Sequence, residues 1–259
     1  MKLYKPSELT PMSGDMILLY GDSGVGKSVT AIQTAPDPII YIQAEGRDVT
    51  KMLTAAQRPG VKIKFGFYST FDDLMQTVVN EEFFTGTRSV VIDSLTHIMA
   101  INLSDEILDE SFEAMDKKKI EKELTMRVKL SQEGYGSLSG NTLRLTNALT
   151  RLSLLGITVI CIARAESAPK FNRALAAAPS FKGREYTKYF AGFFDFIGYV
   201  EDRVVDGQVV YPPSVSFQGD GSFVCKWSGI QPKGGVYKRV LNIEKILDAS
   251  HGRTGTKGE

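Results

Sequence analysis

Residues Gly21 to Ser28 read Gly-Asp-Ser-Gly-Val-Gly-Lys-Ser and match the pattern G-x-x-x-x-G-K-[ST] at every fixed position. The two fixed glycines permit backbone angles closed to other residues, so successive N–H groups can turn inward around phosphate oxygens. Lys27 is placed to reach the β- and γ-phosphates, and the Ser28 hydroxyl to bind Mg²⁺. The stretch predicts a phosphate-binding loop. The residues expected to contact the nucleotide are Gly21, Asp22, Ser23, Gly24, Val25, Gly26, Lys27, Ser28 and Val29.

The segments on either side of this loop occur in the order that a phosphate-binding loop requires. Met16 to Tyr20 is a short apolar run, typical of a buried strand, and Ser28 to Thr34 is expected to form the first turns of a helix. This context favours phosphate binding over the alternative, a glycine-rich turn with an incidental lysine.

The composition is that of an ordinary globular protein. The chain has 259 residues, of which 42% are hydrophobic and 24% charged, with a formal net charge of +1. Any nucleic-acid surface must therefore be local. Two cysteines offer no spacing for zinc or a disulfide framework, and neither a signal peptide nor a membrane span is visible. We expect a cytoplasmic protein with no membrane partner.

The expected organisation is a single α/β domain. This length allows one large domain, which we favour over two small ones. Residues 1–12 form a lead-in, residues 13–249 the domain, and residues 250–259 a polar, glycine-rich tail expected to be disordered.

Glu45 follows the second predicted strand, Ile39 to Ile42. Open α/β sheets bind ligands at the edge where the carboxyl ends of their strands lie. Glu45 is therefore a candidate general base for an attacking water. The alternative is an ordinary surface carboxylate or a helix-start residue.

Asp93 ends a third diagnostic segment, an apolar strand that begins at Ser89 and is followed by Ser94. This is the pattern of a Walker B strand, whose aspartate holds Mg²⁺. Asp93 or Ser94 could instead cap the turn that follows. The phosphate loop upstream favours the metal role, so Ser28 and Asp93 are the predicted metal ligands.

Arg164 and Glu166 stand at the exit of the clearest strand, Ile157 to Ala163, which is continuous and rich in β-branched residues. A polar side chain at this point can sense the γ-phosphate and pass its state to the next loop. An internal ion pair between the two residues is the alternative.

Residues 165–190 contain no convincing regular element, which is long for a loop in a compact domain. From Arg164 to Phe190 there are six basic and two acidic side chains, a local balance of +4. Five aromatic residues are interleaved with these charges: Phe171, Phe181, Tyr186, Tyr189 and Phe190. Such a mixture can hold single-stranded DNA by backbone charge and base stacking together. The alternative is a mobile lid beside core phenylalanines. The candidate DNA contacts are Lys170, Phe171, Arg173, Lys182 and Arg184.

The remaining periodicity predicts further elements. Residues 103–132 read as a charged amphipathic helix or helix pair whose lysines, 117–119, favour a solvated face over contact with nucleic acid. A break is expected at Glu133 to Gly136, before a helix from Leu138 to Leu155. An Asp-Gly turn at residues 206–207 predicts an antiparallel hairpin, so the sheet is mixed at one end. Other expected elements are a strand at 62–67, a helix at 71–84, a strand at 194–200 and a helix at 242–249.

The motifs resemble those of one known family. Tyr-Ile-Gln-Ala-Glu-Gly-Arg-Asp, residues 41–48, is similar to the strand-plus-glutamate element of RecA-type ATPases, and Val-Val-Ile-Asp-Ser, residues 90–94, is similar to their Walker B ending. Gly-Phe-Phe-Asp-Phe-Ile-Gly-Tyr-Val, residues 192–200, resembles the closing strand of small phage nucleotide-binding proteins with a bare RecA core, the Sak-class single-strand-annealing recombinases. The resemblance covers roughly residues 13–249, with specific motifs only in the first half.

The resemblance implies a RecA-like P-loop fold and a Mg²⁺-dependent ATPase stimulated by DNA. By it, Lys27, Ser28 and Asp93 bind ATP and Mg²⁺, and Glu45 activates water. The loop after Ala163 binds single-stranded DNA. Arg164 departs from the family, whose members usually carry an amide or histidine there. Lys182 and Arg184 are candidates to act across a subunit boundary on the γ-phosphate of a neighbouring copy.

The function expected from these features is ATP-dependent binding of single-stranded DNA in phage recombination. The protein would assemble as a filament or ring of identical copies and promote annealing or strand exchange. A single-strand-binding protein is a candidate partner. Three alternatives stay open: a ring-type ATPase that loads or remodels a helicase or another replication partner, a small-molecule phosphotransferase with residues 165–190 as its lid, and a nucleotide-gated binding module without useful turnover.

Overall fold

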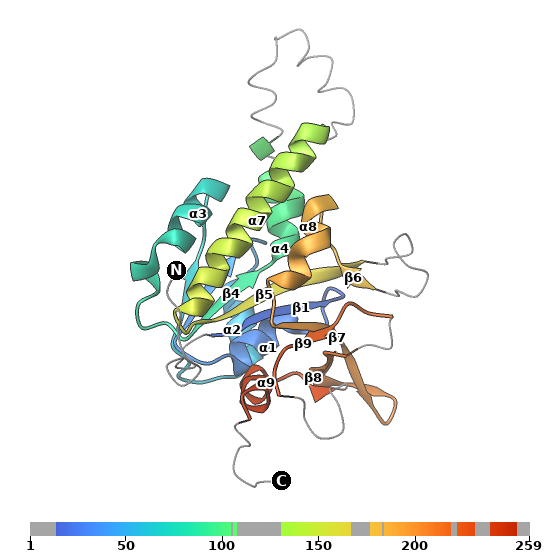
Figure 1. Cartoon of the computed structure of the whole chain (residues 1–259). Helices are drawn as coiled ribbons and strands as arrows, with labels where there is room; N and C mark the ends of the chain where they lie inside the picture. Colours follow the sequence, from blue (N-terminus) through green and yellow to red (C-terminus); the bar gives the residue numbers. More distant parts are fainter. Residues whose placement is uncertain are drawn as a thin grey trace, which may run out of the picture.

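A single mainly parallel β-sheet organises the computed structural model, with helices on both of its faces (Figure 1). The structure describes residues 14–104, 106–107, 131–166, 177–182, 184–218, 222–230 and 239–252. The strands of the sheet run in the spatial order β10-β8-β7-β1-β5-β4-β2-β3. Their bounds are β1 (Met16–Gly21), β2 (Ile39–Gln43), β3 (Ile63–Gly66), β4 (Ser89–Asp93), β5 (Thr158–Glu166), β7 (Phe196–Val205), β8 (Gln208–Ser216) and β10 (Arg239–Val240).

The strands from β3 to β7 along this order pair in parallel, so their carboxyl ends meet at one edge of the sheet. β5 lies between β1 and β4, which places one strand between the phosphate-loop strand and the strand that ends at Asp93. At the other end of the sheet, β8 pairs antiparallel with β7, and β10 with β8. Two short strands, β6 (Ala178–Pro179) and β9 (Lys226–Trp227), pair with β5 and β7.

The helices form two layers because alternate side chains of each strand point to opposite faces. On β1, Leu18 and Tyr20 belong to one apolar cluster, and Ile17 and Leu19 to the other. The first cluster packs under α3 (Phe71–Val79), α4 (Leu95–His97), α7 (Gln132–Leu154) and α8 (Arg184–Tyr189). The second packs under α1 (Lys27–Thr34), α2 (Val49–Ala56) and α9 (Ile243–Ser250). Short helical turns are η2 (Glu81–Phe84), η3 (Ile98–Asn102) and η4 (Phe190–Gly192).

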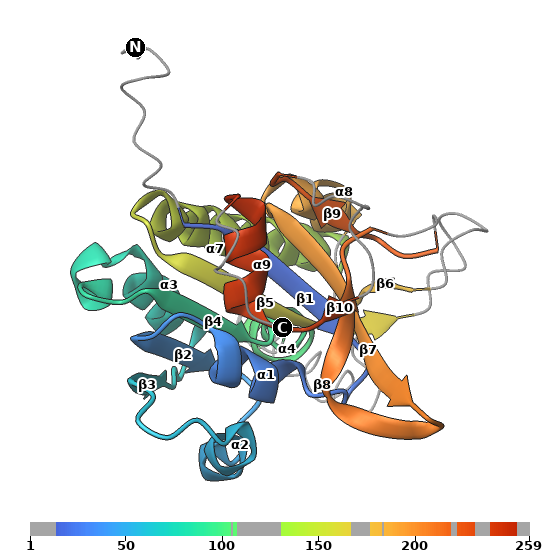
Figure 2. The same cartoon turned by 90° about the horizontal axis from the view of Figure 1, so that it is seen from below.

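This arrangement confirms the predicted fold class. The sheet is an α/β, mainly parallel sheet with the strand order of a RecA-like P-loop protein, and it carries an antiparallel extension at its C-terminal end. The hairpin of β7 and β8 turns at Asp206 and Gly207, both with positive φ, as the Asp-Gly signal predicts. Figure 2 shows this hairpin reaching outward beyond the rest of the sheet.

Two local predictions are wrong. The first is the break before α7, which begins at Gln132 rather than at Leu138. Ser131 caps the helix by accepting a 3.0 Å hydrogen bond from the backbone N–H of Gly134, so the predicted break forms the first turns. The second is the absence of regular structure in residues 165–190, since β5 continues to Glu166, pairs with β6, and is followed by α8.

Other predictions shift only at their boundaries or lie beyond the described residues. The predicted helix at 71–84 divides into α3 and η2, and the one at 242–249 begins one residue later, with Asn242 as its cap. The strand predicted from residue 194 begins at Phe196. Most of the charged segment 103–132, the lead-in 1–12 and residues 253–259 of the tail lie outside the described residues. The domain boundaries stay predictions. Within the described residues, no helix combines the length and the apolar character needed to cross a bilayer.

Candidate functional site

The phosphate loop joins β1 to α1 at the carboxyl edge of the sheet. Two of its glycines have no room for a side chain. A Cβ at Gly21 would lie 2.1 Å from the carbonyl oxygen of Val200, and one at Gly26 would lie 2.7 Å from the ring of Tyr211. Gly26 also has a φ of 90° and precedes α1 without a side-chain cap, so the first N–H groups of this helix keep their hydrogen-bonding capacity for an anion.

Lys27 is buried beneath this loop, with 7% of its surface exposed. Its ammonium donates hydrogen bonds to the backbone carbonyls of Gly21 and Asp22, at 2.8 and 2.7 Å. Burial lowers the pKa of Lys27 to about 8, against the opposing charge of Asp93. The ammonium is thus held within the loop by weak acceptors, ready for an anion that enters it.

Asp93 and Ser28, the two predicted metal ligands, are brought together. The Ser28 hydroxyl donates a 2.6 Å hydrogen bond to Oδ2 of Asp93, which is 3% exposed at the end of β4. The buried Tyr41 hydroxyl, from the neighbouring strand β2, donates to the same oxygen. Burial, and then the charge of Asp93, raise the pKa of Tyr41, which keeps this hydroxyl a donor.

These oxygen atoms fit Mg²⁺, a hard cation that prefers carboxylate and hydroxyl ligands. Among the described residues there is no group of three or more His, Cys, Asp or Glu side chains that could hold a metal by themselves. Such a sparse protein ligand set is typical of Mg²⁺ in nucleotide sites, where phosphate oxygens and waters complete the coordination. Ser28 and Asp93 are therefore suited to hold a nucleotide-bound Mg²⁺.

Glu45 lies in the same pocket, with only 6% of its side chain exposed. Its Oε1 accepts a 2.8 Å hydrogen bond from the Ser94 hydroxyl and lies 3.5 Å from the guanidinium of Arg164. Its Oε2 pairs with the guanidinium of Arg47. Burial alone would raise the pKa of Glu45, but the Ser94 hydrogen bond and the two guanidinium charges together hold it below its usual range. Glu45 is thus a buried, ionised carboxylate and not an exposed surface residue.

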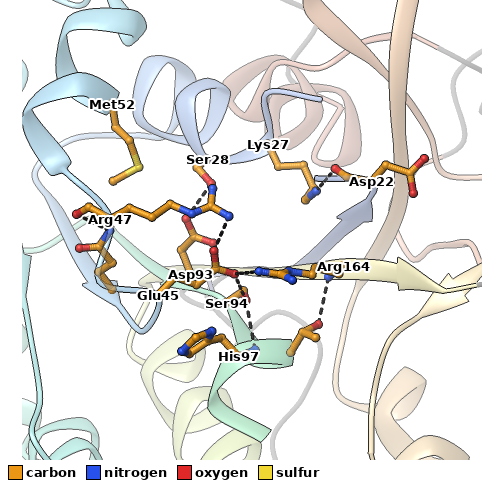
Figure 3. A network of polar contacts seen from close by, with 12 residues as sticks. Asp22, Lys27, Ser28, Glu45, Arg47, Met52, Asp93, Ser94, His97 and Arg164 are labelled. Atoms are coloured by element: carbon orange, nitrogen blue, oxygen red, sulfur yellow. Dashed lines mark hydrogen bonds and ion pairs between the residues drawn. The ribbon is translucent and has the colours of Figure 1, made fainter. Parts of the chain in front are cut away.

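Ser94 connects this carboxylate to the backbone that follows β4. Besides donating to Glu45, its hydroxyl accepts a 3.2 Å hydrogen bond from the backbone N–H of His97 and caps α4. The capping role predicted for Asp93 or Ser94 therefore falls to Ser94, while Asp93 faces Ser28. Figure 3 shows Asp93 beside Ser28 and Ser94 beside His97.

Arg164 turns toward Glu45 and not toward Glu166. The side chain of Glu166 instead accepts a 2.8 Å hydrogen bond from the Ser180 hydroxyl. The alternative of an internal ion pair between Arg164 and Glu166 is therefore wrong, because Glu45 enters from the loop after β2 and supplies the partner. Arg164 remains half exposed at the edge of the pocket.

A chain of hydrogen bonds runs from this edge to the segment after β5. The backbone N–H of Arg164 donates to the Thr96 hydroxyl at 3.0 Å, and that hydroxyl donates to the carbonyl of Ser180 at 3.0 Å. The backbone N–H of Ser180 donates in turn to the carbonyl of Arg164 at 2.7 Å. The position of residues 177–182 is thus tied directly to the end of β5.

The pocket enclosed by these groups is lined by loop, strand and helix residues from the whole carboxyl edge. They are Ser23, Gly24, Gly26, Lys27, Ser28, Val29, Glu45, Arg47, Met52, Asp93, Ser94, Ile162, Ala163 and Arg164. The arrangement can bind a triphosphate, hold a divalent cation and present a carboxylate to a water molecule.

Three residues of this site escaped the sequence reasoning. Tyr41 gave only a weak signal, a hydroxyl within an apolar strand, and its contact with Asp93 depends on how β2 pairs with β4. Arg47 stands two residues after Glu45, and that closeness was its only signal. Thr96 gave none.

The residues predicted to contact DNA are only partly placed. Lys170, Phe171 and Arg173 lie outside the described residues. Lys182 is exposed, with its ammonium 3.4 Å from the carbonyl of Ala100. Arg184 begins α8, and its side chain lies outside the described part of the structure.

Three of the interleaved aromatic residues belong to the core and not to a base-stacking surface. Phe181, Tyr186 and Phe190 are all buried, and Phe181 packs edge-on against the other two rings. The Tyr186 hydroxyl lies 3.1 Å from the Thr146 hydroxyl of α7. The alternative that places phenylalanines of this segment in the core is confirmed for Phe190, and Phe181 and Tyr186 are buried with it, so these three rings are not available for base stacking. Tyr189, in contrast, is 57% exposed.

The fold and this site together define a P-loop nucleotide-binding protein with a RecA-like sheet. Residues 13–245 match the family described as AAA domain, and the chain belongs to that family. It is therefore a P-loop ATPase. The narrower resemblance to single-strand-annealing recombinases stays a prediction.

Among solved structures, the chain is similar to the KaiC-like protein PH0186 from the hyperthermophilic archaeon Pyrococcus horikoshii OT3. The two are 14% identical, the match covers 79% of this chain and 77% of that one, and the TM-score is 0.39. No curated protein matches the chain.

Proposed function

We propose that the protein is a Mg²⁺-dependent ATPase whose bound nucleotide controls its grip on single-stranded DNA. Assembled with further copies of itself, it promotes annealing or strand exchange. The observation that carries this proposal is the chain of contacts from Glu45 through Arg164 and Thr96 to Ser180. It connects the phosphate pocket to the segment in which basic residues outnumber acidic ones.

The chemistry follows from the placement of the charged groups. Ser28 and Asp93 hold Mg²⁺, which neutralises charge on the β- and γ-phosphates when bound. Lys27 leaves its backbone carbonyls for the phosphate oxygens, which are stronger acceptors. These contacts fix the triphosphate with its γ-phosphate at the end of the pocket where Glu45 lies.

Glu45 acts as the general base. Its carboxylate accepts a proton from a water molecule as the water oxygen bonds to the γ-phosphorus. The bond from this phosphorus to the β–γ bridging oxygen breaks, and ADP and phosphate are released. Because the Ser94 hydrogen bond and two guanidiniums hold Glu45 ionised, it is in the correct protonation state before the nucleotide enters.

The coupling to DNA runs through Arg164. When the γ-phosphate is present, the Arg164 guanidinium can bind this second anion as well as Glu45. The contact between Arg164 and Glu45 then weakens. The same residue is hydrogen-bonded by its backbone to Thr96 and Ser180, so a shift at the end of β5 moves residues 177–182. Two states of this strand end would then give two affinities for DNA.

The contact with DNA is mainly electrostatic. With Phe181, Tyr186 and Phe190 buried in the core, the basic side chains carry the attraction, and exposed Tyr189 is the aromatic residue left for base stacking among those described. Binding through phosphates releases counterions, so affinity should fall steeply with salt.

The ATPase rate measured without DNA, with single-stranded DNA and with duplex DNA tests this function. We expect stimulation by single strands that weakens as salt is raised. A rate that ignores DNA would contradict the proposal. A rate that instead requires a nucleoside or sugar would indicate a phosphotransferase.

A further inference from the structure

Arg47 carries a positive charge into the phosphate pocket although the phosphate-loop and Walker B motifs do not call for one there. Its guanidinium pairs with Oε2 of Glu45 while its side chain stays 43% exposed. Figure 3 shows the side chain reaching across the pocket toward Ser28 and Asp93.

The pairing with Glu45 does not by itself explain this arginine. Glu45 is already stabilised by the Ser94 hydroxyl and by Arg164. Two guanidiniums therefore share one carboxylate. Of the described side chains that line the pocket, three are cationic, Lys27, Arg47 and Arg164, and two are carboxylates, Glu45 and Asp93.

The cations of the pocket are close enough to repel one another, because the charge of Arg47 acts on the Lys27 ammonium. Cations crowded in this way are poised for a multivalent anion that relieves their mutual repulsion.

The two arginines differ in how they are held. The backbone of Arg164 is fixed in β5 and hydrogen-bonded to Thr96. Arg47 lies in the bend between β2 and α2, and its backbone carbonyl accepts a 2.9 Å hydrogen bond from the side chain of buried Gln43. Only the backbone of Arg47 is anchored by this bond, so its exposed side chain can rotate about a fixed base.

We propose that Arg47 exchanges Glu45 for the terminal phosphate when a nucleoside triphosphate binds. Without the γ-phosphate, Arg47 holds Oε2 of the carboxylate. With it, the guanidinium binds phosphate oxygens and leaves Oε2 free to accept the proton of the attacking water. Arg47 thus has two roles. It binds the terminal phosphate within the same chain, and by leaving Glu45 it frees the general base. This role rests on the proposed ATP hydrolysis.

The exchange is favourable on electrostatic grounds. A terminal phosphate carries more negative charge than a carboxylate and offers three oxygens to the planar guanidinium fork. A diphosphate has no terminal phosphate to take the place of Glu45. The exchange therefore gives a selectivity for triphosphate over diphosphate that depends on Arg47.

The first measurement compares binding of ADP and of the non-hydrolysable β,γ-imido analogue of ATP, both with Mg²⁺. In Arg47→Ala we expect the analogue to bind about tenfold more weakly, while ADP changes less than about twofold. Arg47→Lys keeps the charge but loses the planar guanidinium fork. Its affinity for the analogue should lie between those of wild type and Arg47→Ala. Lys51→Ala is the matched control, because Lys51 is 86% exposed on α2 and outside the pocket.

A second measurement separates phosphate binding from repulsion by the carboxylate. Glu45→Gln frees Arg47, so it should raise the selectivity for the analogue over ADP by several-fold. This gain should vanish in the double variant Glu45→Gln/Arg47→Ala. An equal gain with and without Arg47 would overturn the proposal, because the removed carboxylate charge alone would then explain it.

Turnover distinguishes an activating role from a merely inhibitory one. We expect kcat of Arg47→Ala to fall by about a thousandfold, the lower end of the range for arginines that stabilise a transferring phosphate. A kcat that rises would overturn the proposal, since Arg47 would then only block Glu45.

If wild type shows the selectivity but hydrolyses no ATP with single-stranded DNA, the proposed function fails and the phosphate contact of Arg47 stands. If wild type hydrolyses ATP and Arg47→Ala retains the selectivity, the Arg47 inference alone fails.

Discussion

The Ser28 hydroxyl donates a 2.6 Å hydrogen bond to the carboxylate of Asp93, although 65 positions separate the two residues in the sequence. The contact exists because β4 and β1 lie on either side of β5 and end at the same edge of the sheet. It places the two oxygen ligands expected for Mg²⁺ in one pocket.

Replacing Asp93 with Asn should remove the Mg²⁺-dependent part of nucleotide binding. The amide is neutral and a weaker ligand for a hard cation. We expect the dissociation constant of ATP with Mg²⁺ to rise at least tenfold, as one strong charged contact is lost. With the metal chelated, the variant should bind ATP at least as tightly as wild type, because a negative charge beside the phosphates has been removed. A variant with unchanged Mg²⁺ dependence would remove Asp93 from the metal site.

Tyr41→Phe tests the second hydroxyl that holds Asp93. Loss of a buried hydrogen bond to the Asp93 carboxylate should lower the free energy of unfolding by about 2 kcal/mol. Tyr186→Phe is the control, since it removes another buried hydroxyl, which lies 3.1 Å from the Thr146 hydroxyl and does not line the pocket. Urea denaturation should show a loss of stability in both variants, smaller for Tyr186→Phe because its partner is uncharged, whereas only Tyr41→Phe should weaken binding of ATP with Mg²⁺. Equal nucleotide affinities in the two variants would contradict the role of Tyr41.

Lys27 gives a prediction for stability against pH. Burial lowers its pKa in the folded protein from 10.5 to about 8, so between these values the unfolded chain binds more protons and the contribution of Lys27 to stability rises with pH. Lys27→Met lacks this titration. Below pH 8 the variant should unfold with the higher free energy, and its advantage should shrink as pH rises from 8 to 10.5. Urea denaturation across this range measures the difference, and a constant difference would contradict the account.

Lys182→Ala tests the contact with DNA. Exposed Lys182 stands in the segment tied to Arg164, and loss of one phosphate contact should reduce the salt dependence of single-stranded DNA binding by about one ion. ATPase activity without DNA should persist. The control is Lys245→Ala, an exposed lysine of α9 on the other face of the sheet. If DNA-free ATPase is lost instead, Lys182 acts on a phosphate of a neighbouring copy, as the alternative role predicts.

The sequence predicted the parts of the site that depend on local pattern. The phosphate loop is a contiguous motif, and Glu45 and Asp93 each follow an apolar run, so strand ends could be located without knowing how the strands pair. Their meeting follows from the general rule that parallel strands end at one edge.

Contacts between distant segments could not be predicted in this way. The bond from Tyr41 to Asp93 needs the register of β2 against β4, and the pairing of Arg47 with Glu45 needs the bend between β2 and α2. Phe181 and Tyr186 were counted in the mixture of basic and aromatic residues expected to hold DNA because charge and aromatic content are visible in the sequence, whereas the packing of these two rings into the core is not.

The affinity for single-stranded DNA, measured with no nucleotide, with ADP and with the non-hydrolysable ATP analogue, tests the central claim most directly. That claim is that the state of the phosphate pocket controls the DNA-binding segment through Arg164, Thr96 and Ser180. We expect tight binding with the analogue and weak binding in the other two states. Equal affinity in all three states would contradict it.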